Sequence, residues 1–138
     1  MGTRDNLVLN VEITSDFGEK LLREIKDVEI NGGSSTSAHA RILFNLEDNL
    51  NYSKIEVHRG LYSSDGVNDD FMLLTVNVRM KNYESEFEKF IEYINPHVVA
   101  MFGESISNVA GFILHDDGKG TNIIRVKGNK IIVEKERI

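Results

Sequence analysis

The chain has 138 residues, 41% of them hydrophobic and 28% charged, and carries a formal net charge of −6 from 16 basic and 22 acidic side chains. These values are typical of one folded domain spanning residues 1–138, and the acidic balance argues against nucleic acid or an anionic membrane as the main partner. The absence of cysteine excludes disulfides and thiolate chemistry, and the lack of a secretory or membrane-spanning apolar run predicts a cytoplasmic protein.

The first half of the chain alternates between strand and helix signals. Apolar residues at every second position predict a strand over residues 6–13. A helix is expected over residues 15–28, with Ser15 or Asp16 as its cap, and Asn31-Gly32-Gly33 ends it. Two further alternating segments predict strands at residues 38–46 and 54–62.

The second half begins with a turn-rich stretch at residues 63–70. It leads into residues 71–80, the most apolar segment of the chain, which we expect to be a central strand. A second helix begins at Asn82 or Tyr83 and ends at Asn95-Pro96, because proline disfavours a helical residue before it. The remaining predictions are a buried helix stripe of Phe87, Phe90, Ile91 and Ile94, a helical turn over residues 98–102, and three strands between Val109 and Glu134.

The predicted order of elements, βαβββαβββ, indicates the fold class. Two helices are too few to connect every pair of successive strands, so most neighbouring strands must run antiparallel. The sequence therefore predicts an α+β fold, a mostly antiparallel sheet of about six to seven strands with two helices packed on one face.

No set of residues in the sequence forms a recognisable catalytic or metal site. The four histidines, at positions 39, 58, 97 and 115, include no pair at helical spacing. No serine lies in a nucleophile elbow, and the stretch around Asp65 lacks the spacing of a calcium loop. We therefore predict no catalytic residue, cofactor or metal. One alternative stays open, because His58 beside Glu56 and His115 beside Asp116 would meet if the third and fifth predicted strands were neighbours.

Acidic residues are concentrated in the middle of the chain. Residues 47–117 hold 13 acidic and five basic side chains, whereas residues 119–138 hold two acidic and six basic ones. On the second predicted helix three glutamates are spaced four apart, and each like-charged pair there costs roughly a few tenths of a kcal/mol. Such a stripe is either a solvated face or a surface that attracts a basic partner. The candidate partner-binding residues are the acids of this helix and of the predicted turns: Asp65, Asp69, Asp70, Glu84, Glu88, Glu92, Asp116 and Asp117.

The last third of the chain carries the sharpest motif. The segment Ala110-Gly111-Phe112-Ile113-Leu114-His115-Asp116-Asp117 is followed by an apolar strand and a Lys-Gly-Asn-Lys turn. It resembles the end of the immunity protein 7 family, small cytoplasmic proteins that neutralise toxin domains of bacterial polymorphic toxin systems. The resemblance implies a helix over residues 87–101, a strand over residues 112–117 that ends in the paired aspartates, and a final hairpin.

The leading functional hypothesis follows from this resemblance, the acidic middle of the chain and the lack of a catalytic set. It is a non-enzymatic, immunity-type inhibitor that neutralises a toxin domain by binding a basic surface. The first alternative is a small enzyme or a ligand- or metal-binding domain that uses His58, His115 and nearby carboxylates. The second is a phage or mobile-element inhibitor of a host complex, which would use the same acidic surface. The sequence predicts neither the identity of the toxin nor the oligomeric state.

Overall fold

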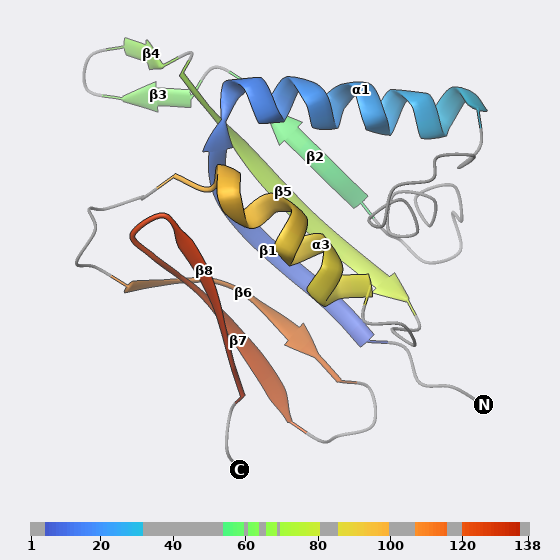
Figure 1. The fold of residues 1–138 in the computed structure, drawn as a ribbon, viewed down its shortest axis with the longest axis vertical. Coiled ribbons are helices and arrows are strands. Elements are labelled where there is room, and N and C mark those ends of the chain that lie inside the picture. Colours follow the sequence, from blue (N-terminus) through green and yellow to red (C-terminus); the bar gives the residue numbers. More distant parts are fainter. Residues whose placement is uncertain are drawn as a thin grey trace.

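The computed structural model describes residues 5–31, 54–59, 61–63, 66–68, 70–80, 86–99, 107–115 and 120–135. The strands are β1 (Asp5–Thr14), β2 (Lys54–His58), β3 (Leu61–Ser63), β4 (Gly66–Asn68), β5 (Phe71–Met80), β6 (Ser107–Leu114), β7 (Thr121–Lys127) and β8 (Lys130–Lys135). The helices are α1 (Ser15–Asn31), α3 (Glu86–Ile94) and the 3-10 helix η3 (Asn95–His97). Six strands form one antiparallel sheet in the order β2-β5-β1-β6-β7-β8, and β3 pairs separately with β4 (Figure 1).

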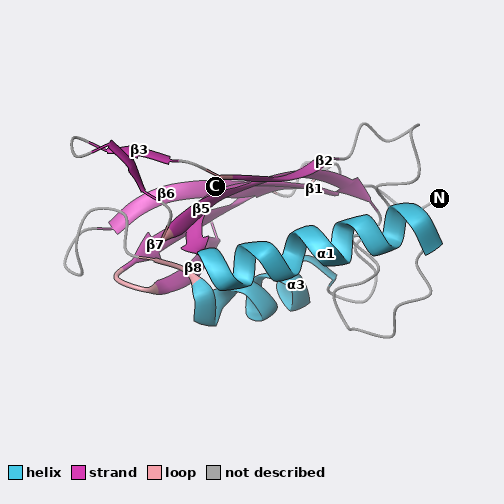
Figure 2. Cartoon of the chain, turned by 90° about the horizontal axis from the view of Figure 1, so that it is seen from above, coloured by secondary structure: helices cyan, strands magenta, loops and turns pink. Residues whose placement is uncertain are grey.

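Strand β1 lies inside the sheet and buries one complete side of its length. Its pairing with β5 covers all ten residues, whereas its pairing with β6 covers Asn6 to Leu9. Successive side chains of a strand point to opposite sides, so the buried residues mark the side of the sheet that carries the core. They are Leu7, Leu9, Val11 and Ile13. Both α1 and α3 lie on that side (Figure 2), which confirms the predicted α+β fold with two helices on one face.

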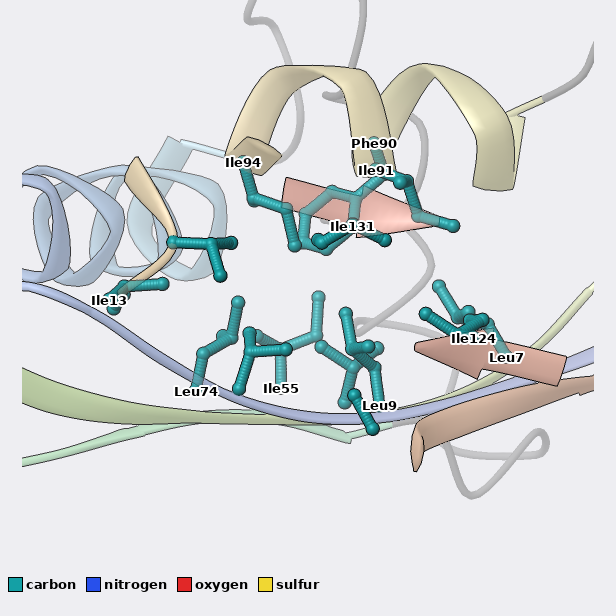
Figure 3. Close-up of a cluster of buried hydrophobic side chains, with 14 of the residues drawn as sticks. Leu7, Leu9, Ile13, Ile55, Leu74, Phe90, Ile91, Ile94, Ile124 and Ile131 are labelled. Carbon is teal, nitrogen blue, oxygen red and sulfur yellow. The ribbon is translucent and has the colours of Figure 1, made fainter. Parts of the chain in front are cut away.

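Helix α3 covers the middle of this core. Figure 3 shows Phe90 and Ile94 above Leu9 and Leu74 of the sheet. Burying a side chain of this size contributes about 1.5–3 kcal/mol, so this helix is held mainly by its contacts with the sheet. The apolar stripe predicted from helical spacing is correct in all four members: Phe87, Phe90, Ile91 and Ile94 are buried.

After α3 the chain forms the short 3-10 helix η3 and then becomes extended at Val98, where a further helical turn was predicted. After η3, Val98 forms an isolated antiparallel bridge with Ile13, and the Val99 N–H donates to the Glu12 carbonyl at 2.9 Å. The prediction of a helical turn over residues 98–102 is therefore wrong at its start. The physical reason is the short pairing of β6 with β1, which ends at Leu9. The backbone of β1 after Leu9 is therefore available to pair with Val98 and Val99.

Three strand predictions need correction or fall outside the described residues. The strand expected over residues 54–62 ends at His58, and Leu61–Ser63 pairs with Gly66–Asn68 inside the stretch predicted as a turn. β5 has the predicted bounds and is paired on both sides, but it is second from the edge and β1 lies nearer the centre. The strand expected at residues 38–46 lies outside the described residues.

Strands β1 and β6 approach each other unusually closely at Gly111. The register of β6 against β7 shifts between Val109 and Gly111, which indicates a bulge at Ala110. A Cβ at position 111 would lie 1.9 Å from the carbonyl oxygen of Val8. Glycine is therefore required here for lack of space.

We expect Gly111→Ala to lower the free energy of unfolding by about 2–3 kcal/mol, because the obstructing atom belongs to the backbone of β1. Urea denaturation followed by circular dichroism would measure the loss. Gly18→Ala is the control, since its Cβ would meet the flexible Met72 side chain, with Sδ at 2.3 Å, and alanine favours a helix. A loss at Gly111 no larger than that at Gly18 would contradict this account.

Candidate partner-binding surface

The outer side of α3 carries two of the predicted acidic residues next to each other. Glu88 and Glu92 are exposed, whereas the apolar residues of the same turns are buried. A spacing of four residues places them one turn apart, a rise of about 6 Å along the axis. Glu84, the third predicted member of this stripe, lies outside the described residues.

A third glutamate of α3, Glu86, lies on the buried side, with an exposed fraction of 2%. Sequence reasoning did not single it out, although the signal was present. Glu86 stands four residues before Phe90 and therefore shares the apolar face of the helix. Of the three glutamates of α3, Glu86 is therefore buried, and Glu88 and Glu92 are exposed.

Helix α1 lies on the same side of the sheet as α3 (Figure 2) and exposes basic side chains. Lys20, Arg23 and Lys26 are exposed, and Lys20 Nζ lies 5.4 Å from the centre of the Tyr93 ring on α3. The Tyr93 hydroxyl donates to Glu24 Oε1 on α1 at 2.7 Å. Partial burial, with this hydrogen bond as the second cause, raises the pKa of Tyr93, so the hydroxyl keeps its proton. The helix layer therefore combines the acidic pair of α3 with an α1 of mixed charge, which also exposes Asp16 and Asp27.

Asp70 belongs to a different part of the molecule. It is exposed at the start of β5, and its carbonyl oxygen accepts a hydrogen bond from Ser15 N–H at 3.1 Å. Asp16 follows Ser15 in the first turn of α1 and is also exposed. Asp16 was predicted as a helix cap and not as a surface acid. The structure thus brings Glu88 and Glu92 together but leaves Asp70 on another element; Asp65, Asp69, Asp116 and Asp117 lie outside the described residues.

His58 and His115 do not meet, because the third and fifth predicted strands are not neighbours, so the alternative of a shared histidine site is excluded. Strands β5 and β1 separate β2 from β6. His58 is opposite Leu73, which is opposite Glu12, whereas His115 Nδ1 lies 3.2 Å from Asp5 Oδ2. Glu12 and Asp5 are about 23 Å apart along β1. One site cannot use both histidines.

His58 belongs to a polar cluster on the edge strand β2. Its Nε2 lies 3.3 Å from Glu56 Oε2 and 3.2 Å from Thr75 Oγ1. Lys54 Nζ lies 2.6 Å from Glu56 Oε1, and this hydrogen bond lowers the pKa of Glu56. The cluster borders a shallow hollow of about 180 Å³ that includes Asn77. Ligand pockets usually measure about 300–1,000 Å³, so this hollow does not support a site for a larger small molecule.

The other described histidines have structural contacts. His115 lies between Asp5 Oδ2 at 3.2 Å and Asn122 Oδ1 at 3.3 Å, and so joins the ends of β6, β1 and β7. The His97 ring is stacked on Phe17 at 4.0 Å between centres. Within the described part of the chain, no three side chains of His, Cys, Asp or Glu are grouped to hold a metal ion. His39 lies outside it.

Comparisons with models of protein families, with curated proteins and with solved structures give no match. The elements implied by the immunity protein 7 resemblance are present with shifted bounds. The helix ends at Ile94, not at Met101, and the following strand runs over Ser107–Leu114. None of the described helices is long and apolar enough to cross a membrane.

We expect His115→Ala to lower the free energy of unfolding by about 1–2 kcal/mol, because it removes both contacts of a ring that joins three strands and leaves Asp5 without one of its partners. Chemical denaturation would measure this. His58→Ala is the matched control, since the His58 side chain is 44% exposed and that of His115 is 25% exposed, and we expect it to remain close to the unchanged chain. Equal losses in the two variants would show that the contacts of His115 contribute nothing particular.

Proposed function

We propose that the protein is a non-enzymatic, immunity-type inhibitor that binds a toxin domain with a basic surface through the exposed acidic side of α3. One observation carries the proposal. Glu88 and Glu92 are exposed one turn apart on a helix whose opposite side is fixed in the core. This spacing concentrates negative charge on one exposed side of α3.

The rigidity of α3 makes this pair suitable for binding. Phe87 and Phe90 are completely buried, so the helix does not need to be ordered when a partner arrives. Binding by a preformed surface avoids part of the entropic cost of association. Two carboxylates held side by side also attract a basic surface from a distance and increase the rate of encounter.

The basic residues of α1 would restrict how such a partner docks. Lys20 lies against the ring of Tyr93, the residue that follows Glu92 on α3, so a positive charge of α1 reaches this helix. A basic partner would meet like charge close to Lys20, which costs free energy and disfavours that position. Elsewhere α1 exposes acidic side chains as well, among them Asp16 and Asp27.

An inhibitor accounts for the described polar residues better than an enzyme does. Catalysis requires an acid, a base or a nucleophile that converge on one reacting atom. His58, His97 and His115 instead contact different elements, and the hollow beside the His58 cluster is shallow. This distribution supports a binding role, in which function depends on surface charge and shape.

The test requires a toxin domain to be encoded next to the gene of this chain, and it uses that domain in purified form. We expect the double substitution Glu88→Lys with Glu92→Lys to slow association by at least about tenfold and to weaken its dependence on salt, because exposed charges act mainly on the encounter rate. Stopped-flow measurements at low and high ionic strength would give both quantities. Thermal unfolding should be little changed, since exposed charges contribute little to stability.

Lys89→Glu is the control on the same helix, because Lys89 is also exposed and the substitution makes the surface more acidic. We expect it to leave association unchanged or faster. An association rate and a salt dependence that are the same in the double variant and the unchanged chain would contradict the role of α3. A toxin domain that does not bind the unchanged chain would contradict the immunity function itself.

A further inference from the structure

The hollow beside the His58 cluster opens on the side of the sheet away from the helices. No described helix lies on this side (Figure 2), and we call this side of the six-stranded sheet the open face. On β1 it carries the residues that alternate with the buried set of Leu7, Leu9, Val11 and Ile13. Three strands, β2, β5 and β1, line the hollow with Lys54, Glu56, Thr75, Asn77, Val8 and Asn10.

The register of the strands places these six side chains on one face. Residues directly opposite each other on neighbouring strands point to the same side, and their Cβ atoms are about 4.5–5.5 Å apart. One row runs from Lys54 through Asn77 to Val8. The next row runs from Glu56 through Thr75 to Asn10. The hollow is therefore built by regular strand pairing and not by the position of a loop.

The charged side chains at the rim of the hollow already contact each other. Lys54 Nζ lies 2.6 Å from Glu56 Oε1, and His58 Nε2 lies 3.3 Å from Glu56 Oε2. An ionic ligand would have to break these contacts, whereas a neutral ligand leaves them in place. The hollow therefore favours a neutral ligand that is held by hydrogen bonds.

Two asparagine side chains of the hollow supply groups for such hydrogen bonds. Asn6 Nδ2 donates to Asn77 Oδ1 at 2.9 Å, which orients the Asn77 amide and leaves its own N–H groups as donors. Asn10 is exposed and lies diagonally across from Asn77, at about 7–8 Å. An amide offers a donor and an acceptor side by side, and two adjacent hydroxyl groups match this pair. The lining therefore indicates a ligand with several hydroxyl groups.

An apolar surface lies directly beside these amides. Phe112 on β6 is opposite Val8 and is 39% exposed. An aromatic ring next to a valine presents a surface that packs against the apolar side of a ligand. Small-molecule sites combine such an apolar lining with a few placed polar groups. A sugar ring matches both features, because its faces carry C–H groups and its edge carries hydroxyl groups.

We propose that this hollow binds one neutral sugar ring. Asn10 and Asn77 hydrogen-bond adjacent hydroxyl groups of the ring, while Val8 and Phe112 pack against one of its faces. The volume of about 180 Å³ lies below the roughly 300–1,000 Å³ of usual ligand pockets, so one ring is the largest unit that the hollow holds. The site lies on the opposite side of the sheet from α3 and is therefore independent of the proposed immunity function.

Nuclear magnetic resonance titrations of the isotope-labelled chain would measure this binding. The probes are the methyl glycosides of glucose, galactose and N-acetylglucosamine, each added up to about 50 mM. We expect at least one of them to shift the signals of β1 and β5 around the hollow, and the side-chain amide signals of Asn10 and Asn77 most. The expected dissociation constant is about 1–10 mM, because a shallow site forms few contacts.

Alanine variants test which residues hold the ring. We expect Asn10→Ala and Asn77→Ala each to raise the dissociation constant at least about fivefold, because each removes hydrogen bonds to the ligand. Both residues are exposed, so thermal unfolding should be little changed. Asn129→Ala is the matched control, since Asn129 is an exposed asparagine in the turn between β7 and β8 at the other end of the sheet. It should leave the dissociation constant within about a factor of two.

Disaccharides distinguish the two sources of such a ring. An affinity that a second ring leaves unchanged or raises indicates the end of a glycan chain as the ligand. An affinity that the second ring lowers indicates a free monosaccharide. Both results support the site, because both require the hollow to hold one ring.

Two results would overturn the proposal. One is a titration in which none of the three glycosides shifts the signals around the hollow. The other is a dissociation constant that Asn10→Ala and Asn77→Ala leave as unchanged as Asn129→Ala does, because the sugar would then bind elsewhere on the chain. Neither result bears on the binding of a toxin domain through α3.

Discussion

The rest of the structure depends on the burial of β1 between β5 and β6. The four residues of β1 that point inward have no exposed surface. The helices that carry the surface charges pack on the apolar layer that these residues form. The partners of β1 come from residues 71–80 and 107–114, far along the chain. The core therefore closes only after distant segments have met, which predicts slower folding than in a protein of local contacts.

The two edges of the sheet are protected in different ways. β2 carries the charged cluster of Lys54, Glu56 and His58, and charged side chains discourage strand addition. At the other edge, Asn95 Oδ1 accepts the N–H of Ile131 on β8 at 2.8 Å. This contact occupies a backbone donor that points away from β7. Both edges of the sheet are therefore hindered against the addition of a further strand.

Local periodicity explains what could be predicted from the sequence. The alternation of β1, the bounds of β5 and the buried stripe of α3 each follow from residues close together in the chain. The order of the strands depends on contacts between distant segments, and no local pattern indicates that β1 separates β5 from β6. The same limit explains the error at Val98, which pairs with β1 beyond the end of its pairing with β6. It also explains why the sequence left open whether His58 and His115 meet.

The candidate sites were predictable to different degrees for a related reason. Glu88 and Glu92 were found because helical spacing alone places them away from Phe90. The open face was not found, because an exposed Phe112 and a buried Ile113 look alike in a run of apolar residues. Only the register against β1 and β7 assigns them to opposite sides.

The two proposed surfaces are constrained to different extents by the core. On α3, exposed and buried residues share the same turns, yet a change at Glu88 or Glu92 leaves the apolar stripe in place. On β1 and β5, open-face and core residues alternate, so a shift of one position would exchange Asn10 for Val11 and move the buried set into solvent. The charge of α3 is thus free to vary with a partner, whereas the position of the open face is fixed by the same register that builds the core.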